Sequence, residues 1–338
     1  MKGLTLVETG RVEWTDTPEP KIEGAGEAIV RPLAVALCDL DVNMIRGTFP
    51  IQTPVALGHE FVGEVLDVSD EVRGMTVGDR VSVPFQISCG ECGRCRRGQT
   101  GDCESVPRLS MYGFGAFGGD WGGALSDLVR VPYADAMLVP LPQGVDPAVV
   151  ASASDNIPDG WRTVGPFLER RPGADVLVVG GGARSIPMYA IEIAHAKGAS
   201  RVVYIDTDEE RLRLAAELGA ETIEGPPPHR TGPFPITVDT SATHEGLACA
   251  LRSTEPGGVC THIGIIPEPE TPLPLFEMYT NGIEFHTGRV MARPVMPEIL
   301  DLTAAGDLHP EQVTSSVVAW EQAPDAVLEP TTKLVITR

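Results

Sequence analysis

Residues 175–206 read DVLVVGGGARSIPMYAIEIAHAKGASRVVYID, and this stretch determines the class of fold that we expect. The apolar run 175–179 predicts a strand, a glycine turn follows it, and residues 186–197 have the apolar spacing of a helix. A second apolar strand is expected at 201–205 and a second helix at 208–218. Strands that alternate with helices predict an α/β domain on a parallel sheet, with right-handed crossovers.

The glycine turn is a candidate phosphate-binding site. Gly180, Gly182 and Ser185 occupy the three glycine positions of the pattern G-x-G-x-x-G, with Ala183 and Arg184 between the last two. Glycines let a backbone approach a pyrophosphate closely, and the free amides at a helix N-terminus attract it. Arg184 either reaches a phosphate or lies in solvent.

Asp206 closes the second strand and bears on the choice of cofactor. Its carboxylate can accept hydrogen bonds from both hydroxyls of an adenosine ribose, and its charge would repel a 2′-phosphate. The pattern therefore predicts that the chain binds a dinucleotide and prefers NAD to NADP. A glycine turn in a similar sheet that binds nothing is the alternative.

Outside this stretch, the first 140 residues differ in character from the remainder of the chain. Residues 1–140 contain short β-type runs broken by Gly and Pro, which is typical of a barrel-like all-β unit. Residues 224–235 form a Pro-rich surface loop by their composition. A helix is expected at 297–305, and further strands at 236–240, 259–265, 283–287 and 332–337.

Four cysteines share one short polar loop, residues 89–103, with the spacing C-x2-C-x2-C-x7-C. They are Cys89, Cys92, Cys95 and Cys103. Four thiolates at this spacing fit one tetrahedral zinc ion of the closed, structural kind. Arg94 and Arg96 carry charges that would lower the thiolate pKa values. Two disulfides or an iron–sulfur cluster are the alternatives.

Composition limits the partners and the location. The net charge of −21 argues against nucleic acid and anionic membranes as partners, because phosphate binding needs clustered basic residues. No apolar run approaches the length of about 20 residues that a membrane span needs. The beginning, MKGLTLVETG, lacks the apolar core of a signal peptide, so we expect a cytoplasmic protein. Cys249 and Cys260 lie in apolar segments and should be buried.

Several motifs together resemble the zinc-dependent medium-chain alcohol dehydrogenase family. They are the four-cysteine loop, the glycine turn, GHEFVGEV at 58–65, GDRVSVPFQISCGECGRC at 78–95, VDTSATHEG at 238–246 and LRSTEPGGVCTHIG at 251–264. The resemblance covers essentially the whole chain. It implies a GroES-like β-barrel catalytic domain, 1–147 with 289–338, and a Rossmann doubly wound parallel-sheet domain, 148–288.

The resemblance also implies a catalytic zinc in the cleft between the two domains, in addition to the structural zinc. By motif position its ligands would be Cys38, His59 and Asp155, which leave a fourth position open for water or substrate. Glu60 would lie beside the metal or bind it transiently. Asp41 matches the acid that orients the zinc-bound histidine.

The chain departs from the family pattern at the proton relay, and three aromatic residues are candidates for the substrate pocket. Relatives usually carry Ser or Thr two residues after the ligand cysteine, where this chain has Leu40; Asn43, at a place some relatives fill with histidine, cannot titrate either. Phe49 and Phe85, by family position, and Trp121, by its glycine-rich loop, are candidates to line a pocket for a partly apolar substrate.

These observations predict an enzyme that passes a hydride between an alcohol, secondary or polyol, and NAD. Two other functions remain open: a carbonyl reductase that uses the same zinc site, and a non-catalytic NAD-binding protein that retains the fold. The resemblance further implies a homodimer or a homotetramer that acts on a small molecule.

Overall fold

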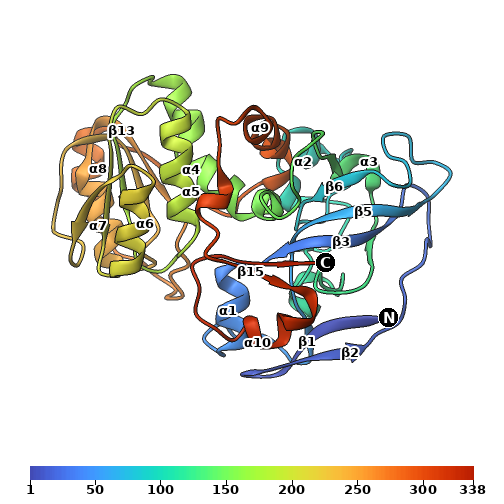
Figure 1. Cartoon of the computed structure of the whole chain (residues 1–338). Coiled ribbons are helices and arrows are strands. Elements are labelled where there is room, and N and C mark those ends of the chain that lie inside the picture. Colours follow the sequence, from blue (N-terminus) through green and yellow to red (C-terminus); the bar gives the residue numbers. More distant parts are fainter. The chain divides into compact units, whose positions relative to one another are not determined.

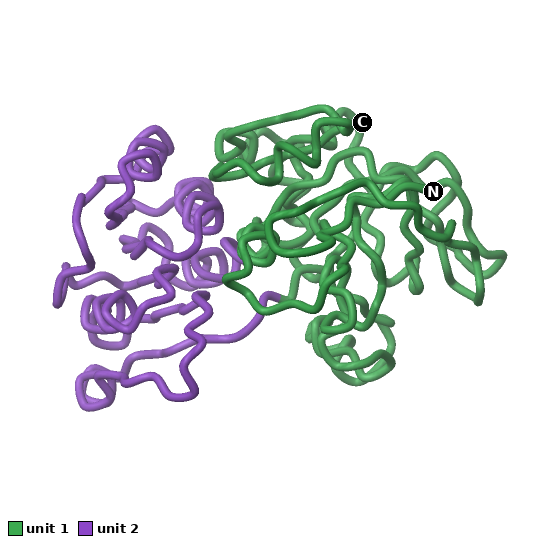
Figure 2. Tube along the Cα trace, turned by 90° about the horizontal axis from the view of Figure 1, so that it is seen from below, with its two compact units in different colours: residues 1–158, 291–338 green, residues 159–290 purple.

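The computed structural model describes residues 1–338, which fold into two compact units (Figure 2). Unit 1 is Met1–Pro158 with Met291–Arg338, and unit 2 is Asp159–Val290. The chain therefore leaves unit 1, forms unit 2 and returns. The boundaries of the two domains predicted from the sequence stay a prediction.

Unit 2 is built on one six-stranded parallel sheet (Figure 1). Its strands are β9 (Val176–Val179), β10 (Val202–Asp206), β11 (Glu221–Glu224), β12 (Phe234–Asp239), β13 (Thr254–His262) and β14 (Glu284–Thr287). The order β11-β10-β9-β12-β13-β14 corresponds to 3-2-1-4-5-6, which is the doubly wound arrangement of dinucleotide-binding domains. The predicted Rossmann fold is confirmed.

Four helices connect these strands, and α4 (Asn156–Arg170) leads into the unit. They are α5 (Ile186–Ala196), α6 (Glu209–Glu217), α7 (His244–Ser253) and α8 (Leu275–Asn281). Local capping explains where two of them begin. The Asp208 carboxylate accepts a hydrogen bond from the Arg211 amide at 2.9 Å, and Thr243 Oγ1 accepts one from the Gly246 amide at 3.1 Å.

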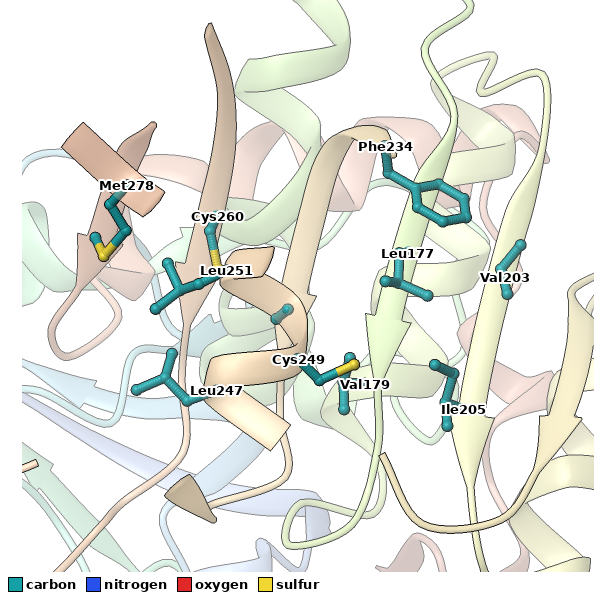
Figure 3. Close-up of a cluster of buried hydrophobic side chains, with 11 residues drawn as sticks. Leu177, Val179, Val203, Ile205, Phe234, Leu247, Cys249, Leu251, Cys260 and Met278 are labelled. Atoms are coloured by element: carbon teal, nitrogen blue, oxygen red, sulfur yellow. The ribbon is translucent and has the colours of Figure 1, made fainter. Parts of the chain in front are cut away.

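The core of unit 2 lies between the sheet and the helices that follow β12 and β13 (Figure 3). Strand residues at a spacing of two contribute one face of it. They are Leu177, Val179, Val203, Ile205, Phe234 and Cys260. From the helices come Leu247, Cys249, Leu251 and Met278. Cys249 and Cys260 are buried here as apolar side chains, as the sequence predicted.

Unit 1 contains two sheets, in the orders β2-β1-β4 and β15-β16-β3-β5-β6-β8, with β7 paired to β3. The strands are β1 (Lys2–Glu8), β2 (Arg11–Asp16), β3 (Ala28–Ala36), β4 (Val55–Ala56), β5 (Glu60–Val68), β6 (Arg80–Val83), β7 (Val129–Val131), β8 (Val139–Pro140), β15 (Ser316–Ala319) and β16 (Leu334–Thr337). All pairs are antiparallel except β15 with β16. The predicted β unit is therefore present.

Helices of unit 1 are short apart from one. They are α1 (Asp39–Ile45), α2 (Gly93–Arg96), α3 (Ala134–Met137), α9 (Ala292–Ala305) and α10 (Ala323–Ala326), with the 3₁₀ turns η1 (Thr100–Asp102), η2 (Gly115–Gly118), η3 (Ala151–Ser154), η4 (Pro310–Gln312) and η5 (Trp320–Gln322). None of the helices in the structure has the length and apolar character that crossing a membrane requires.

Three elements differ from the sequence-based expectation. Helix α9 begins at Ala292, before the predicted start at Pro297, and Pro297 lies inside the helix. Strand β13 begins at Thr254, earlier than the predicted start at residue 259, and runs through Gly257 and Gly258. Strand β11 was not predicted because all four of its residues are exposed and carry no apolar pattern.

Candidate functional site

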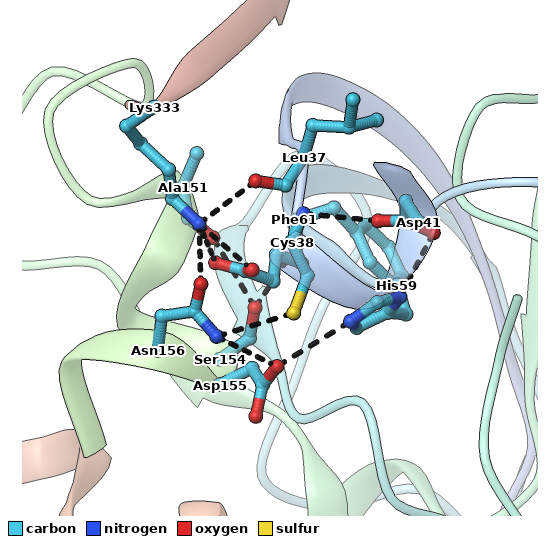
Figure 4. Close-up of polar contacts among 11 residues, drawn as sticks. Leu37, Cys38, Asp41, His59, Phe61, Ala151, Ser154, Asp155, Asn156 and Lys333 are labelled. Carbon is cyan, nitrogen blue, oxygen red and sulfur yellow. Dashed lines mark hydrogen bonds and ion pairs between the residues drawn. The ribbon is translucent and has the colours of Figure 1, made fainter. Parts of the chain in front are cut away.

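Four potential metal ligands meet within unit 1 (Figure 4). Cys38 precedes α1 directly after β3, His59 and Glu60 stand at the start of β5, and Asp155 follows η3. One ligand atom from each of these residues lies within 4.8 Å of the others, and all four side chains are buried. The structure thus brings the three predicted catalytic ligands together and adds Glu60 to the same cluster.

His59 lies between two carboxylates, and a metal-bound imidazole typically has one carboxylate beside the ring nitrogen that faces away from the metal. Its Nε2 lies 3.3 Å from Asp155 Oδ2, and its Nδ1 lies 3.4 Å from Asp41 Oδ1. The Asp41 side chain is fixed because its Oδ2 accepts a hydrogen bond from the Cys38 amide at 3.0 Å. Asp41 therefore faces the nitrogen of His59 that points away from the cluster, as predicted from its motif position.

The charges of the cluster suit a divalent cation. Burial raises the pKa of the Cys38 thiol to about 12, so this group would stay neutral without a nearby cation. Burial acts to lower the pKa of His59, but the charge of Asp41 and hydrogen bonding of the ring to the Asp155 carboxylate, which accepts, leave that pKa well above the usual value. A thiol, an imidazole and a carboxylate converge here, and a bound zinc ion is what favours the thiolate in such a set. The donor set fits zinc.

A buried lysine, Lys333, lies next to the cluster, although the sequence did not indicate it as a site residue (Figure 4). Lys333 Nζ donates to both carboxylate oxygens of Glu60, at 2.9 and 3.0 Å, and to Asn156 Oδ1 at 2.7 Å. Burial raises the pKa of Glu60 to about 7, against the charge of Lys333. The only local sign was a lysine next to the apolar final strand, and nothing in the sequence connects it with Glu60.

Aromatic rings form one side of the cluster. The ring centres of Phe114 and Phe85 lie 5.1 and 5.7 Å from that of His59. Phe49 contacts Phe114 edge-on at 6.5 Å. Phe117 then joins Phe49 and Phe114, at 6.1 and 6.4 Å.

Two of the three predicted pocket residues, Phe49 and Phe85, therefore belong to this aromatic group. No ring contact joins Trp121 to it; the indole Nε1 is buried without a hydrogen-bond partner. Phe114 and Phe117 were missed, although both stand in the glycine-rich run that contains Trp121.

The four-cysteine loop has the geometry of a second metal centre. All four sulfur atoms lie within 4.8 Å of one another, and the cysteines form no disulfide. Backbone amides point at the sulfurs: the Cys92 amide donates to Cys89 Sγ at 3.3 Å and the Cys95 amide to Cys92 Sγ at 3.4 Å. Ser105 Oγ lies 3.2 Å from Cys89 Sγ. These donors stabilise thiolates, so the loop fits a tetrahedral zinc ion.

At Cys89, hydrogen bonds rather than the expected arginine charges account for the lowered pKa, whereas burial raises the pKa of Cys95 and Cys103. Burial acts to raise the pKa of Cys89, but hydrogen bonds from Ser105 and from the amides of Cys92 and Glu91 lower it to about 6. Arg94, expected to act on the thiolates, is instead directed at Glu104, with Nε 3.4 Å from the carboxylate.

The glycine turn stands between β9 and α5, where a dinucleotide fold places it. A side chain at Gly180 would collide with Tyr204 and Asp206, and a Cβ at Gly182 would lie 2.7 Å from that of Ala242. Close packing within the protein thus requires both glycines. The Ala183 amide donates to the Thr240 carbonyl at 3.0 Å, so it is engaged within the protein. Arg184 is half-buried beside the turn.

Asp206 ends β10 as predicted, but both oxygens of its carboxylate already accept hydrogen bonds from other groups of the protein. Arg211 binds it with two parallel hydrogen bonds of 2.8 Å, from Nε and Nη2. The Tyr204 hydroxyl and the amides of Thr207 and Asp208 also donate to it. Burial acts to raise the pKa of Asp206, and the bonds from Arg211 and Tyr204 lower it overall, so the group is an anion paired with a cation.

Comparisons with known proteins agree with both units. The family model "Alcohol dehydrogenase GroES-like domain" matches residues 24–143, and the model "Zinc-binding dehydrogenase" matches residues 186–305. An alcohol dehydrogenase of Geobacillus stearothermophilus is 30% identical over 307 residues, which cover 86% of this chain and 85% of that protein. A probable zinc-binding alcohol dehydrogenase of Mycobacterium tuberculosis is 28% identical over 329 residues, 96% of this chain and 83% of its own.

Solved structures of other dehydrogenases and reductases are similar to this chain over its whole length. The alcohol dehydrogenase TADH from Thermus sp. ATN1 superimposes with a TM-score of 0.89 at 28% identity, over 100% of this chain and 99% of that one. Acetophenone reductase from Geotrichum candidum, solved with NAD, gives a TM-score of 0.81 at 21% identity, over 100% and 97% of the two chains. At that identity the second match supports the fold alone.

Proposed function

The chain belongs to the zinc-dependent medium-chain alcohol dehydrogenase family, and from this premise we propose that it transfers a hydride between a secondary alcohol or polyol and NAD. Zinc-dependent alcohol oxidoreduction with a nicotinamide cofactor is the activity of the family. The proposal for this chain rests on one observation, the convergence of Cys38, His59 and Asp155 in unit 1. These three side chains would hold the catalytic zinc.

Each residue of the cluster has a distinct task in this proposal. A zinc ion held by Cys38, His59 and Asp155 would supply Lewis acidity at an alcohol or carbonyl oxygen, and a bound nicotinamide would supply the acceptor or donor of the hydride. Asp41 keeps the His59 ring oriented with Nε2 toward the other ligands. The rings of Phe85 and Phe114 border the cluster, which favours a substrate with an apolar group next to its reacting carbon.

Carbonyl reduction is the second candidate. Leu40 stands where relatives carry the hydroxyl that relays the alcohol proton, so this chain lacks the usual path for that proton. A panel of alcohols, polyols, aldehydes and ketones, assayed in both directions at neutral pH with zinc-loaded protein, separates the two. We expect measurable oxidation of secondary alcohols with NAD, faster for those with an apolar substituent. Turnover of carbonyls alone would favour the reductase, and no turnover of any compound would favour the binding protein.

Cofactor preference should depend on the Asp206–Arg211 pair. We propose that NAD is preferred, but that Arg211 offsets much of the charge with which Asp206 would repel a 2′-phosphate. Arg211→Ala leaves the carboxylate unpaired, so the ratio of the NADPH to the NADH dissociation constant should rise about tenfold, the factor that 1.4 kcal/mol produces. Asp206→Asn leaves the guanidinium unpaired, and the same ratio should fall by a similar factor.

Quenching of intrinsic fluorescence by NADH and NADPH measures both constants. Arg213→Ala is the matched control, because Arg213 lies on the same helix, is exposed and pairs only with Glu217. A shift of the ratio in the same direction in both test variants, or none in either, would show that another residue discriminates between the cofactors.

A homodimer or homotetramer is proposed as the assembled form. Three apolar side chains of α8 are strongly exposed: Leu275 by 67%, Phe276 by 79% and Tyr279 by 83%. The neighbouring strand β14 ends its sheet. A second copy of the chain would cover both features, and sedimentation velocity reports the number of chains per particle.

A further inference from the structure

The Lys333 ammonium is completely buried, and its acceptors connect it to the proposed zinc ligands (Figure 4). Besides the two oxygens of Glu60 and the amide oxygen of Asn156, it donates to the Leu37 carbonyl at 3.0 Å. Leu37 immediately precedes Cys38, and Asn156 immediately follows Asp155. A buried ammonium surrounded by charged or polar acceptors has few alternative positions. If it moved away from any of them, it would lose a hydrogen bond that no water molecule replaces in the interior.

Asn156 transmits this constraint to two of the ligands. Its Nδ2 donates to Cys38 Sγ at 3.4 Å and to Asp155 Oδ2 at 3.1 Å, while its Oδ1 accepts from Lys333. An ammonium can only donate, so the amide oxygen must face Lys333 and the NH₂ group must face the thiol and the carboxylate. Lys333 therefore determines which way the Asn156 amide points.

Glu60 is the competitor in this arrangement. Its carboxylate is close enough to Cys38, His59 and Asp155 to join them on a metal ion. Both of its oxygens are bonded to Lys333 instead. To act as a ligand, Glu60 would have to leave the ammonium, which would then be buried without its counter-charge.

We propose that Lys333 and Asn156 select the ligands of the catalytic zinc. Lys333 keeps Glu60 away from the metal, and Asn156 is a positioning residue that directs the Cys38 sulfur and the Asp155 carboxylate toward it. This inference rests on the proposed function, because it assumes the catalytic zinc. Its consequence is that the fourth metal position stays open for substrate.

The role of Asn156 is tested by zinc release to a chromogenic chelator. The loop zinc and the catalytic zinc should leave in two phases, and the phase that is absent from Asp155→Ala belongs to the catalytic site. Asn156→Leu keeps the size of the side chain but removes both donated hydrogen bonds. We expect it to weaken zinc binding at the catalytic site about 10- to 100-fold, the usual effect of losing a partner of a metal ligand, and to leave the loop phase unchanged.

Asn43→Leu is the matched control, since Asn43 is an exposed asparagine of the same unit. It should leave both phases unchanged. The loop phase also reports whether each variant is folded. A catalytic phase in Asn156→Leu within twofold of the wild type would overturn the role of Asn156.

The role of Lys333 is tested by the absorption spectrum of the cobalt-substituted protein, from which the spectrum of Asp155→Ala is subtracted to remove the loop contribution. Lys333→Met should release Glu60 onto the metal, raise the coordination number and weaken the d–d bands. Lys333→Met combined with Glu60→Gln removes both charges and should restore the wild-type bands. Wild-type bands in Lys333→Met, or no restoration in a folded double variant, would overturn it.

The same variants separate a wrong set of zinc ligands from a wrong role for Asn156 and Lys333. If the wild type and Asp155→Ala release zinc identically, the ligands in the proposed function are wrong. If they differ as expected but Asn156→Leu and Lys333→Met behave like the wild type, only the selection of ligands by these two residues is wrong.

Discussion

Asp155→Ala is expected to lower kcat/KM by at least about 10³-fold and to remove one zinc ion per chain. The carboxylate is one of only three predicted ligands, and Lewis-acid assistance contributes several kcal/mol to lowering such a barrier. A loss of about 4 kcal/mol corresponds to a factor of about 10³. The fold should survive, because the four-cysteine loop is formed by other residues, 89–103. Steady-state kinetics and elemental analysis of the same preparation give both results.

Asp146→Asn is the matched control for this substitution. Asp146 is an exposed carboxylate in the segment that leads to Asp155, and its Oδ1 accepts only a local hydrogen bond, from the Ala148 amide at 2.9 Å. It should leave zinc content and kcat/KM unchanged. A fully active Asp155→Ala protein with an unaltered zinc content would refute the ligand assignment.

Cys95→Ser should have the largest effect on stability. Cys95 is buried in the four-sulfur group, and a serine hydroxyl is a poor zinc ligand. Loss of a structural metal belongs to the substitutions that cost about 4 kcal/mol or more. For a protein of this size that corresponds to a fall of roughly 6 °C in Tm. Differential scanning calorimetry measures it, and elemental analysis should find one zinc ion fewer.

Cys249→Ser provides the comparison. Cys249 is also buried but packs in the apolar core of unit 2, and it belongs to neither group of metal ligands. Its zinc content should equal that of the wild type. If Cys95→Ser keeps its zinc and its Tm, the loop does not hold a structural metal.

The sequence pattern predicted those elements that depend on residues close together in the chain. The strand, glycine turn and helix at 175–197 form as expected, and the four cysteines of the loop converge because they are close in sequence. The family resemblance, not spacing, linked Cys38 to His59 and Asp155. Their assembly depends on β3, β5 and η3 packing together.

Contacts between distant residues account for what the sequence did not predict. Lys333 is 273 residues from Glu60, and Asn156 is 118 residues from Cys38, so no periodicity or motif connects either pair. Arg211 is close to Asp206 along the chain, yet its contact follows from how α6 folds back against the end of β10. The position of Asp206 at the end of its strand predicted a role in cofactor binding, but its contact with Arg211 is seen only in the structure.

Anomalous scattering at the zinc absorption edge, from crystals of the zinc-loaded protein, tests the central claim most directly. We predict two peaks per chain, one bonded to Cys38, His59 and Asp155 with Glu60 still on Lys333, and one among the four cysteines of residues 89–103. A single peak in the cysteine loop, with no cation between Cys38, His59 and Asp155, would contradict the account.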